Sequence, residues 1–386
     1  MMITTRKSKR TRTAPVRVAF FIDSLSRAGT ESQLLALIRE LDRSRVEPSL
    51  ILLDGETPES RELEPFNCPI LRLGVKSFAS RKAVSQSVKF ISFLRREQID
   101  VLQIFFSDSL YFGAPLAKLA GVPHVLRVRN NLGHFLTPLH RKLGRVYGRI
   151  VDLTLTNSTS GKQALIEAER ISQRRIVVLE NGVDLDRFEG MKPPDTSRSD
   201  VVRIGLVGNL RSVKNIDGLI RAAEQIVKVD SRCRFEVAGE GDQRVELEQQ
   251  IADAKLSNRF QLSGSIANVP EFLSRLDIAV LCSHSEGMSN ALLEYMASGR
   301  AIVATDVGAN ERLVHDGEQG LIIPPKDDAA IVSAIRRYLQ EPELAVRMGR
   351  NARRKVEREF SREAMRLRFE EFYESLMRNG SSEPKA

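Results

Sequence analysis

The 386-residue chain contains no tryptophan, only three cysteines, and no apolar run of the roughly 18 residues that a membrane-spanning helix needs. Its cysteines, Cys68, Cys233 and Cys282, are widely spaced and odd in number, so neither a zinc motif nor a disulfide framework is predicted. The basic start of the chain is followed by no apolar block long enough for a secretion signal. These absences favour a protein of the reducing cytoplasm.

Acidic residues are missing between Asp108 and Asp152, although the whole chain carries both signs of charge and a formal net charge of +9. The basic residues of this stretch are Lys118, Arg127, Arg129, Arg141, Lys142, Arg145 and Arg149. Such a positive field suits an anionic acceptor or an anionic membrane surface. Nucleic acid is the least favoured partner, because the chain lacks tryptophan and shows no nucleic-acid-binding module.

No G-x-G-x-x-G sequence follows the first strand of either half, which argues against an NAD-dependent oxidoreductase. Short apolar runs alternate with helical patterns along the chain, so an α/β fold with doubly wound parallel sheets is predicted. The length favours two domains. We expect a disordered basic tail at 1–15, a first domain at 16–190, a proline-containing linker at 191–200, a second domain at 201–360, a last helix at 361–378 and a disordered tail at 379–386.

One stretch, S-H-S-E-G-M-S-N-A-L-L-E-Y-M-A from 283 to 297, reads as the end of a buried strand, a turn and a helix. Glu286 would lie on the turn, and Glu294 would follow about 12 Å further along the helix axis. The backbone N–H groups at the start of this helix, contributed by Gly287, Met288, Ser289 and Asn290, suit an anion. Two carboxylates and these donors could border one cleft.

Other loops that leave strand ends supply further candidates. Gly208, Asn209, Arg211 and Lys214 follow the first strand of the second half, and the two cations would face the same crevice. The backbone of Gly264 and Ser265 could contact a nucleotide base. In the first half, Gly29 could bring backbone close to a phosphate.

The run E-G-M-S-N-A-L-L-E-Y-M-A-S-G-R-A-I-V-A-T-D-V-G-A-N-E resembles the signature of retaining GT-B glycosyltransferases of group 1, or family 4. The string N-L-R-S-V-K resembles that family's phosphate motif. The resemblance implies two Rossmann-like domains facing a central cleft, with a C-terminal helix that crosses back to the first domain. It also implies that Glu286 faces the donor sugar, Glu294 the ribose, and that Lys214 and Arg211 hold the diphosphate.

The first half departs from the family pattern. Arg129 stands where many relatives have histidine, and Ala28 replaces a glycine before Gly29. A guanidinium suits phosphate or carboxylate, so Arg129 and Asn130 are acceptor-side candidates. His284, beside the turn, is expected to be a strand-end residue and not a catalyst.

The resulting hypothesis is a retaining hexosyltransferase of the cytoplasm, peripheral on the inner face of the plasma membrane, that uses a UDP- or GDP-sugar and no metal or other cofactor. Its acceptor would be a lipid-linked intermediate or a glycan in cell-surface polysaccharide biosynthesis. Two alternatives remain open: a nucleotide-sugar epimerase, and a protein that binds a nucleotide sugar without catalysis. An epimerase would need acid/base side chains in the first-half loops, and a non-catalytic binder would be expected to lack the paired glutamates or the lysine.

Overall fold

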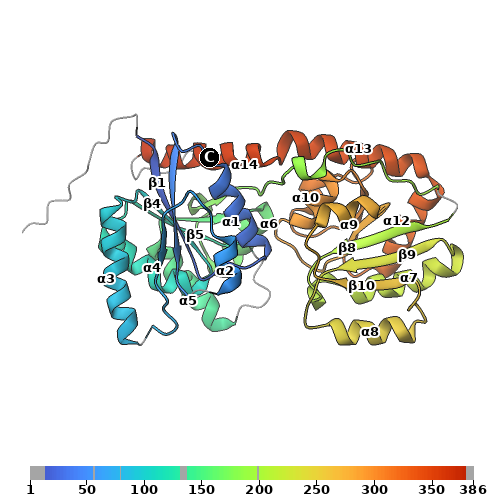
Figure 1. Ribbon diagram of the computed structural model, residues 1–386, viewed down its shortest axis with the longest axis horizontal. Coiled ribbons are helices and arrows are strands. Elements are labelled where there is room, and N and C mark those ends of the chain that lie inside the picture. The colour runs from blue at the N-terminus through green and yellow to red at the C-terminus, as the bar shows by residue number, and fades with distance from the viewer. Residues whose placement is uncertain (1–13, 55–56, 79, 131–136, 198–199, 380–386) are drawn as a thin grey trace, which may run out of the picture.

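The computed structural model describes residues 14–54, 57–78, 80–130, 137–197 and 200–379. Over these residues the chain forms two side-by-side α/β bodies, here called the first and second halves, with one long C-terminal helix along each of them (Figure 1). Each half is built on one parallel sheet, as the alternation of strands and helices predicts.

The first sheet has the strand order β3-β2-β1-β4-β5-β6-β7 and the second the order β10-β9-β8-β11-β12-β13. The strands of the first half are β1 Val16–Ile22, β2 Val46–Leu52, β3 Ile70–Arg72, β4 Val101–Phe105, β5 His124–Val128, β6 Leu153–Thr156 and β7 Ile176–Val178. Those of the second are β8 Val202–Val207, β9 Cys233–Ala238, β10 Phe260–Gly264, β11 Ile278–Leu281, β12 Ala301–Thr305 and β13 Leu321–Ile323. Both orders are doubly wound, so the carboxyl ends of the strands form one edge of each sheet.

Helices cover both faces of each sheet and close four hydrophobic cores. In the first half they are α1 Gly29–Glu40, α2 Pro58–Leu63, α3 Arg81–Arg96, α4 Ser107–Ala120, α5 Pro138–Ile150 and α6 Thr159–Glu169. In the second half they are α7 Ile216–Val229, α8 Arg244–Asp253, α9 Val269–Arg275, α10 Asn290–Ala297, α11 Asn310–Leu313, α12 Asp328–Gln340 and α13 Pro342–Glu359. Short 3-10 turns occur at Gln173–Arg175, Asp186–Phe188 and Ser212–Lys214.

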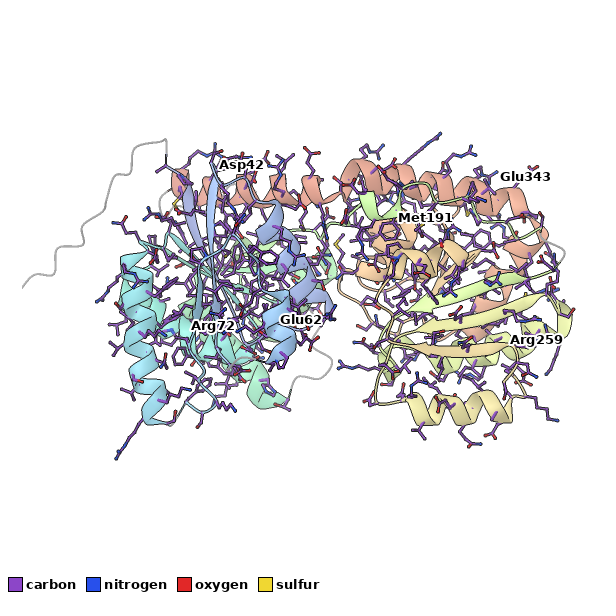
Figure 2. The ribbon with its side chains drawn as sticks, in the orientation of Figure 1. Asp42, Glu62, Arg72, Met191, Arg259 and Glu343 are labelled. Carbon is purple, nitrogen blue, oxygen red and sulfur yellow. The ribbon has the colours of Figure 1, made fainter. Side chains whose placement is uncertain are left out.

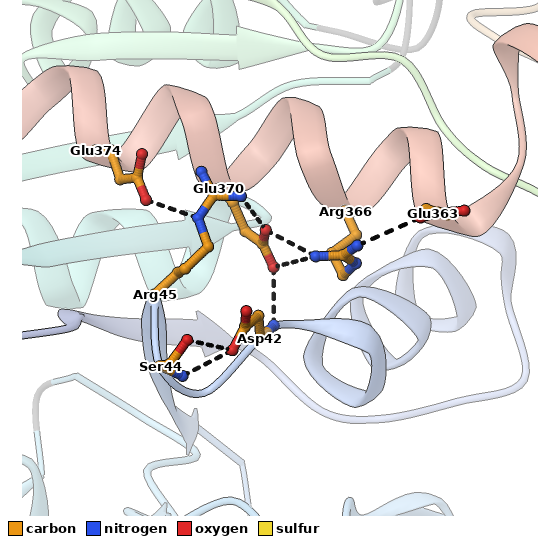
Figure 3. A network of polar contacts seen from close by, with 7 residues as sticks. All are labelled: Asp42, Ser44, Arg45, Glu363, Arg366, Glu370 and Glu374. Atoms are coloured by element: carbon orange, nitrogen blue, oxygen red, sulfur yellow. Dashed lines mark hydrogen bonds and ion pairs between the residues drawn. The ribbon is translucent and has the colours of Figure 1, made fainter.

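The last helix, α14 Arg362–Asn379, returns to the first half. Its Tyr373 is fully buried there and donates a hydrogen bond to Gln103 on β4 over 2.8 Å. The buried carboxylate of Glu370 accepts from Arg45 and from the backbone N–H of Asp42 (Figure 3). Figure 2 shows Asp42 over one half and Glu343, at the start of α13, over the other. The crossing C-terminal helix expected from the resemblance is therefore confirmed.

The predicted strands and helices are present with shifted ends. Helix α1 begins at Gly29, so Gly29 is the first helical residue and not part of a free loop. Ser158 caps α6, because its hydroxyl accepts the N–H of Gly161. The expected tails fall largely outside the described residues.

Candidate active site

A cavity of about 1860 Å³ lies between the two halves, at the carboxyl ends of their strands. This is the place where doubly wound sheets hold ligands. All but one of the predicted site residues line it: Gly29, Arg129, Asn130, Gly208, Asn209, Arg211, Lys214, Ser265, Glu286, Gly287, Met288, Ser289, Asn290 and Glu294. The exception is Gly264, which instead joins the backbone of Gly239 through an isolated bridge.

Lys214 and Glu286 meet on the wall formed by the second half. The Lys214 ammonium lies 2.6 Å from a Glu286 carboxylate oxygen, and the hydroxyl of Ser283 donates to the same oxygen over 2.7 Å. The two side chains come from the loops after β8 and β11, which are neighbouring strands. Both are largely buried, so the pair is shielded from water and held in one geometry.

Glycines let the turn at Glu286 pack tightly against its surroundings. A Cβ on Gly308, whose φ is +65°, would lie 2.1 Å from the Glu286 carbonyl oxygen. A Cβ on Gly287 would lie 2.2 Å from the carbonyl oxygen of Asn130, which belongs to the first half. Backbone of the two halves therefore approaches closely beside Glu286, and only glycine fits at both positions.

Glu294 is a carboxyl group held in a poorly hydrated place. Burial raises its pKa from 4.5 to about 7, and the neighbouring cation Arg187 offsets this only in part. The flanking residues Leu293 and Tyr295 are fully buried, which explains the loss of hydration. Glu294 still reaches the cavity, so a ligand hydroxyl could bind to it.

The remaining second-half candidates lie around this centre. Arg211 is exposed to the cavity, and it lies just before the 3-10 turn that ends at Lys214. Gly208 packs on the aliphatic stem of Lys214, since a Cβ there would lie 3.6 Å from two of its carbons. His284, by contrast, is absent from the cavity wall, and its backbone N–H donates to the Val213 carbonyl over 2.8 Å.

Arg129 lines the first-half wall, but it is not a solvated loop charge. Its guanidinium pairs with Glu169, and the second oxygen of that carboxylate lies 2.5 Å from Arg127. Lys118 in turn pairs with Asp152. The positive field expected between Asp108 and Asp152 is thus partly neutralised by acidic residues at its end and beyond it, which sequence position alone did not reveal. Two guanidinium groups still share the single carboxylate of Glu169.

Sequence reasoning missed several polar residues of the wall. Asp23, at the end of β1, accepts from the backbone N–H and the hydroxyl of Ser109, yet burial raises its pKa to about 6. Asn157 is only 5% exposed, and its side-chain oxygen has no hydrogen-bond partner. Gln33 donates to the Gly182 carbonyl, and the Asn181 side chain donates to the side-chain oxygen of Asn290. A polar residue directly after a buried strand was the available signal for Asp23 and Asn157.

No group of three or more His, Cys, Asp or Glu side chains in the described part of the chain is arranged to hold a metal ion. Within the same residues, no helix has both the length and the apolar character needed to cross a bilayer.

Known proteins match this chain over both halves. The family model "Glycosyltransferase Family 4" matches residues 27–187, and "Glycosyl transferases group 1" matches residues 191–355. The alpha-D-kanosaminyltransferase of Streptomyces kanamyceticus is 32% identical over 148 residues, which are 38% of this chain and 38% of that protein. The chain thus aligns with well under half of that relative's length.

Two longer matches extend the comparison. A Campylobacter jejuni enzyme, N-acetylgalactosamine-N,N'-diacetylbacillosaminyl-diphospho-undecaprenol 4-alpha-N-acetylgalactosaminyltransferase, is 26% identical over 85% of this chain and 91% of its own length. The crystal structure of Anabaena HepE in complex with UDP and glucose superposes with a TM-score of 0.82 at 20% identity, covering 94% of this chain and all of that one. The two family matches, the two-sheet fold and the paired site residues together show that the chain belongs to the group 1, or family 4, GT-B glycosyltransferases.

Proposed function

We propose that this protein transfers a hexosyl group from a nucleoside diphosphate sugar to an acceptor bound against the first half, with retention of anomeric configuration. The observation that carries the proposal is the Lys214–Glu286 pair beside the start of α10, inside the cavity between the halves. The cation and the helix N–H groups suit the diphosphate of such a donor, and the carboxylate suits the hydroxyls of its sugar.

In the proposed mechanism, negative charge grows on the diphosphate as its bond to the sugar breaks. Lys214, Arg211 and the first N–H groups of α10 stabilise that charge, and they do so more strongly in the transition state than in the bound donor. Glu286 faces the sugar, where its carboxylate accepts hydroxyl protons and favours positive charge at the reacting carbon. Glu294 holds the ribose hydroxyls. A leaving phosphate oxygen takes the proton of the acceptor, so His284 has no catalytic role.

We propose a lipid-linked or glycan acceptor, in keeping with the lipid diphosphate in the name of the Campylobacter jejuni relative. The first-half wall supports an acceptor with an anionic group, because the guanidinium groups of Arg127 and Arg129 line the cavity there. A UDP- or GDP-sugar is the proposed donor, and UDP is the nucleotide bound to the HepE structure. Epimerisation of the nucleotide sugar is the second candidate, favoured by the titratable carboxyl of Asp23 in the same cavity.

We further propose that the protein works in the cytoplasm against an anionic membrane surface. Helix α3, at the outer edge of the first half in Figure 1, contains five basic residues and no acidic one. Val84 and Val88, one turn apart on it, are 68% and 66% exposed. Exposed apolar side chains among cations suit an anionic bilayer. Sedimentation with phosphatidylglycerol vesicles should exceed that with phosphatidylcholine vesicles, and equal binding to both would contradict the idea.

The activity is tested in two steps. Thermal unfolding with UDP-, GDP- and ADP-sugars identifies the donor as the compound that raises the melting temperature. NMR of the product formed with lipid diphosphate or oligosaccharide acceptors then reports the new bond and its anomeric configuration. Transfer with retention supports the proposal, whereas release of an epimerised nucleotide sugar without transfer supports the alternative. Stabilisation without any product would indicate a binding protein.

A further inference from the structure

The first residue of α10 is hydrogen-bonded across the cavity to the first half. The Asn290 side-chain NH₂ donates to the Gly29 carbonyl over 3.2 Å. Its oxygen accepts from Asn181 over 2.8 Å and from Gln33 over 3.2 Å. Gly29 and Gln33 belong to α1, and Asn181 follows β7. One amide side chain of the second half therefore makes three hydrogen bonds to two separate segments of the first half.

The receiving groups are themselves fixed. Gln33 donates to the Gly182 carbonyl over 2.9 Å and accepts from the Gly182 N–H over 3.2 Å. Both ends of the Gln33 amide are thus held before Asn290 meets it. The backbone N–H of Asn181 also points at the Met288 sulfur, 3.3 Å away. Fixed partners lower the entropy lost when the contact forms, so the arrangement favours one docked geometry.

Asn290 also belongs to the group of residues proposed to hold the donor diphosphate. Its backbone N–H lies in the first turn of α10, where N–H groups lack intrahelical partners. The backbone and the side chain of Asn290 are covalently joined, so they move together apart from rotation of the side chain between rotamers. Docking of the first half on the Asn290 side chain therefore fixes the direction of the N–H groups that face the diphosphate.

We infer that Asn290 is a positioning residue that couples nucleoside diphosphate binding to docking of the first half on α10, through Gln33 and Asn181. The inference depends on the proposed function. Coupling of this kind is reciprocal: docking tightens nucleotide binding, and bound nucleotide tightens docking by the same factor. A first-half residue should then control affinity for a ligand held mainly by the second half.

The test measures affinity for UDP and for GDP by calorimetry in the wild type and in variants of the full chain. Asn290→Ala should weaken binding of the preferred nucleotide about tenfold, and Gln33→Ala should weaken it by a smaller factor, because it removes one of the three Asn290 hydrogen bonds. The double variant should bind no more weakly than Asn290→Ala, since that substitution already removes the contact with Gln33. Gln249→Ala, an exposed amide on α8, is the matched control and should bind as the wild type does. Melting temperatures and circular dichroism of each variant establish that it is folded.

A second readout follows docking without relying on activity. Small-angle scattering should give a larger radius of gyration for Asn290→Ala than for the wild type without nucleotide, and added nucleotide should narrow that difference. The coupling is wrong if the wild type binds UDP or GDP but neither single variant binds it more weakly. It is also wrong if the losses of affinity in the two single variants multiply in the double variant. In both cases the proposed function stands. If the wild type binds no nucleotide, the proposed function and the coupling fall together.

Discussion

Replacing Glu294 by glutamine should stabilise the protein in a manner that depends on pH. The carboxyl keeps a pKa of about 7 in the folded chain against 4.5 in the unfolded chain, because burial disfavours its charged form. The folded state therefore binds the proton more tightly, and stability is lost as the pH rises from 4.5 to 7. The rise in the pKa of Glu294 from 4.5 to about 7 lowers the free energy of unfolding by about 3 kcal/mol at pH 8.

The glutamine side chain of Glu294→Gln is uncharged at every pH, so burying it does not destabilise the fold as the pH rises. Its free energy of unfolding should exceed that of the wild type by about 1 kcal/mol at pH 5 and by about 3 kcal/mol at pH 8. Denaturant unfolding at the two pH values measures both gaps. Glu246→Gln on the exposed face of α8 is the matched control, with no growing gap expected. A gap at Glu294 that stays constant with pH would refute the assignment of a desolvated carboxyl.

The same substitution should impair donor binding. If the ionised carboxylate holds the ribose, wild-type affinity for the nucleotide should fall about tenfold between pH 8 and pH 6, where about one molecule in eleven is ionised. Glu294→Gln should bind weakly at both pH values and lose the dependence. A wild-type affinity that is flat over this range would show that Glu294 does not contact the nucleotide as an anion.

Three further substitutions test other parts of the site. Lys214→Ala should lower kcat by about 10²- to 10³-fold in a transfer assay, because it removes the cation at the leaving diphosphate. The circular dichroism spectrum should be unchanged. Retained activity would exclude this role for Lys214. Glu169→Ala should lower the free energy of unfolding by about 3–5 kcal/mol, since it leaves Arg127 buried without its carboxylate partner. Denaturant unfolding measures this difference, and a change below about 1 kcal/mol would mean that water reaches the ion pair. Asn157→Leu should leave the free energy of unfolding unchanged or raise it, because it removes a buried oxygen that has no hydrogen-bond partner. If that oxygen accepts a hydrogen bond from a substrate hydroxyl, the same variant should transfer the sugar at least about tenfold more slowly. Full activity would show that Asn157 has a structural role only.

Much of the second-half wall was predictable because its chemistry is local. Glu286 and Glu294 lie on one turn-and-helix segment, and Lys214 follows a strand next to theirs. Parallel strands in a doubly wound sheet end at one edge, so loops that leave neighbouring strands converge without any knowledge of side-chain packing. The cation and the carboxylates could therefore be placed at one crevice from the sequence, although the ion pair between Lys214 and Glu286 was not predicted.

The contacts that sequence reasoning missed join distant segments. Arg127 and Glu169 are 42 residues apart, and Gln33 and Asn290 are 257 residues apart. Neither pair has a spacing that marks it, since each depends on how a helix packs on a sheet or how one half meets the other. Arg129 illustrates the limit: its charge and loop position suited an anionic acceptor, whereas its pairing with Glu169 depends on the placement of α6.

Helix α10 can tolerate the cost of Glu294 because the rest of the helix is apolar and buried. Leu292, Leu293, Tyr295 and Met296 are all 0% exposed. Full burial of one such side chain stabilises the fold by about 1.5–3 kcal/mol, so two of them offset a desolvated carboxyl of about 3 kcal/mol. A glutamine would serve packing as well and would cost less. The retention of a carboxyl that the fold would be more stable without is best explained by a ligand that needs its charge.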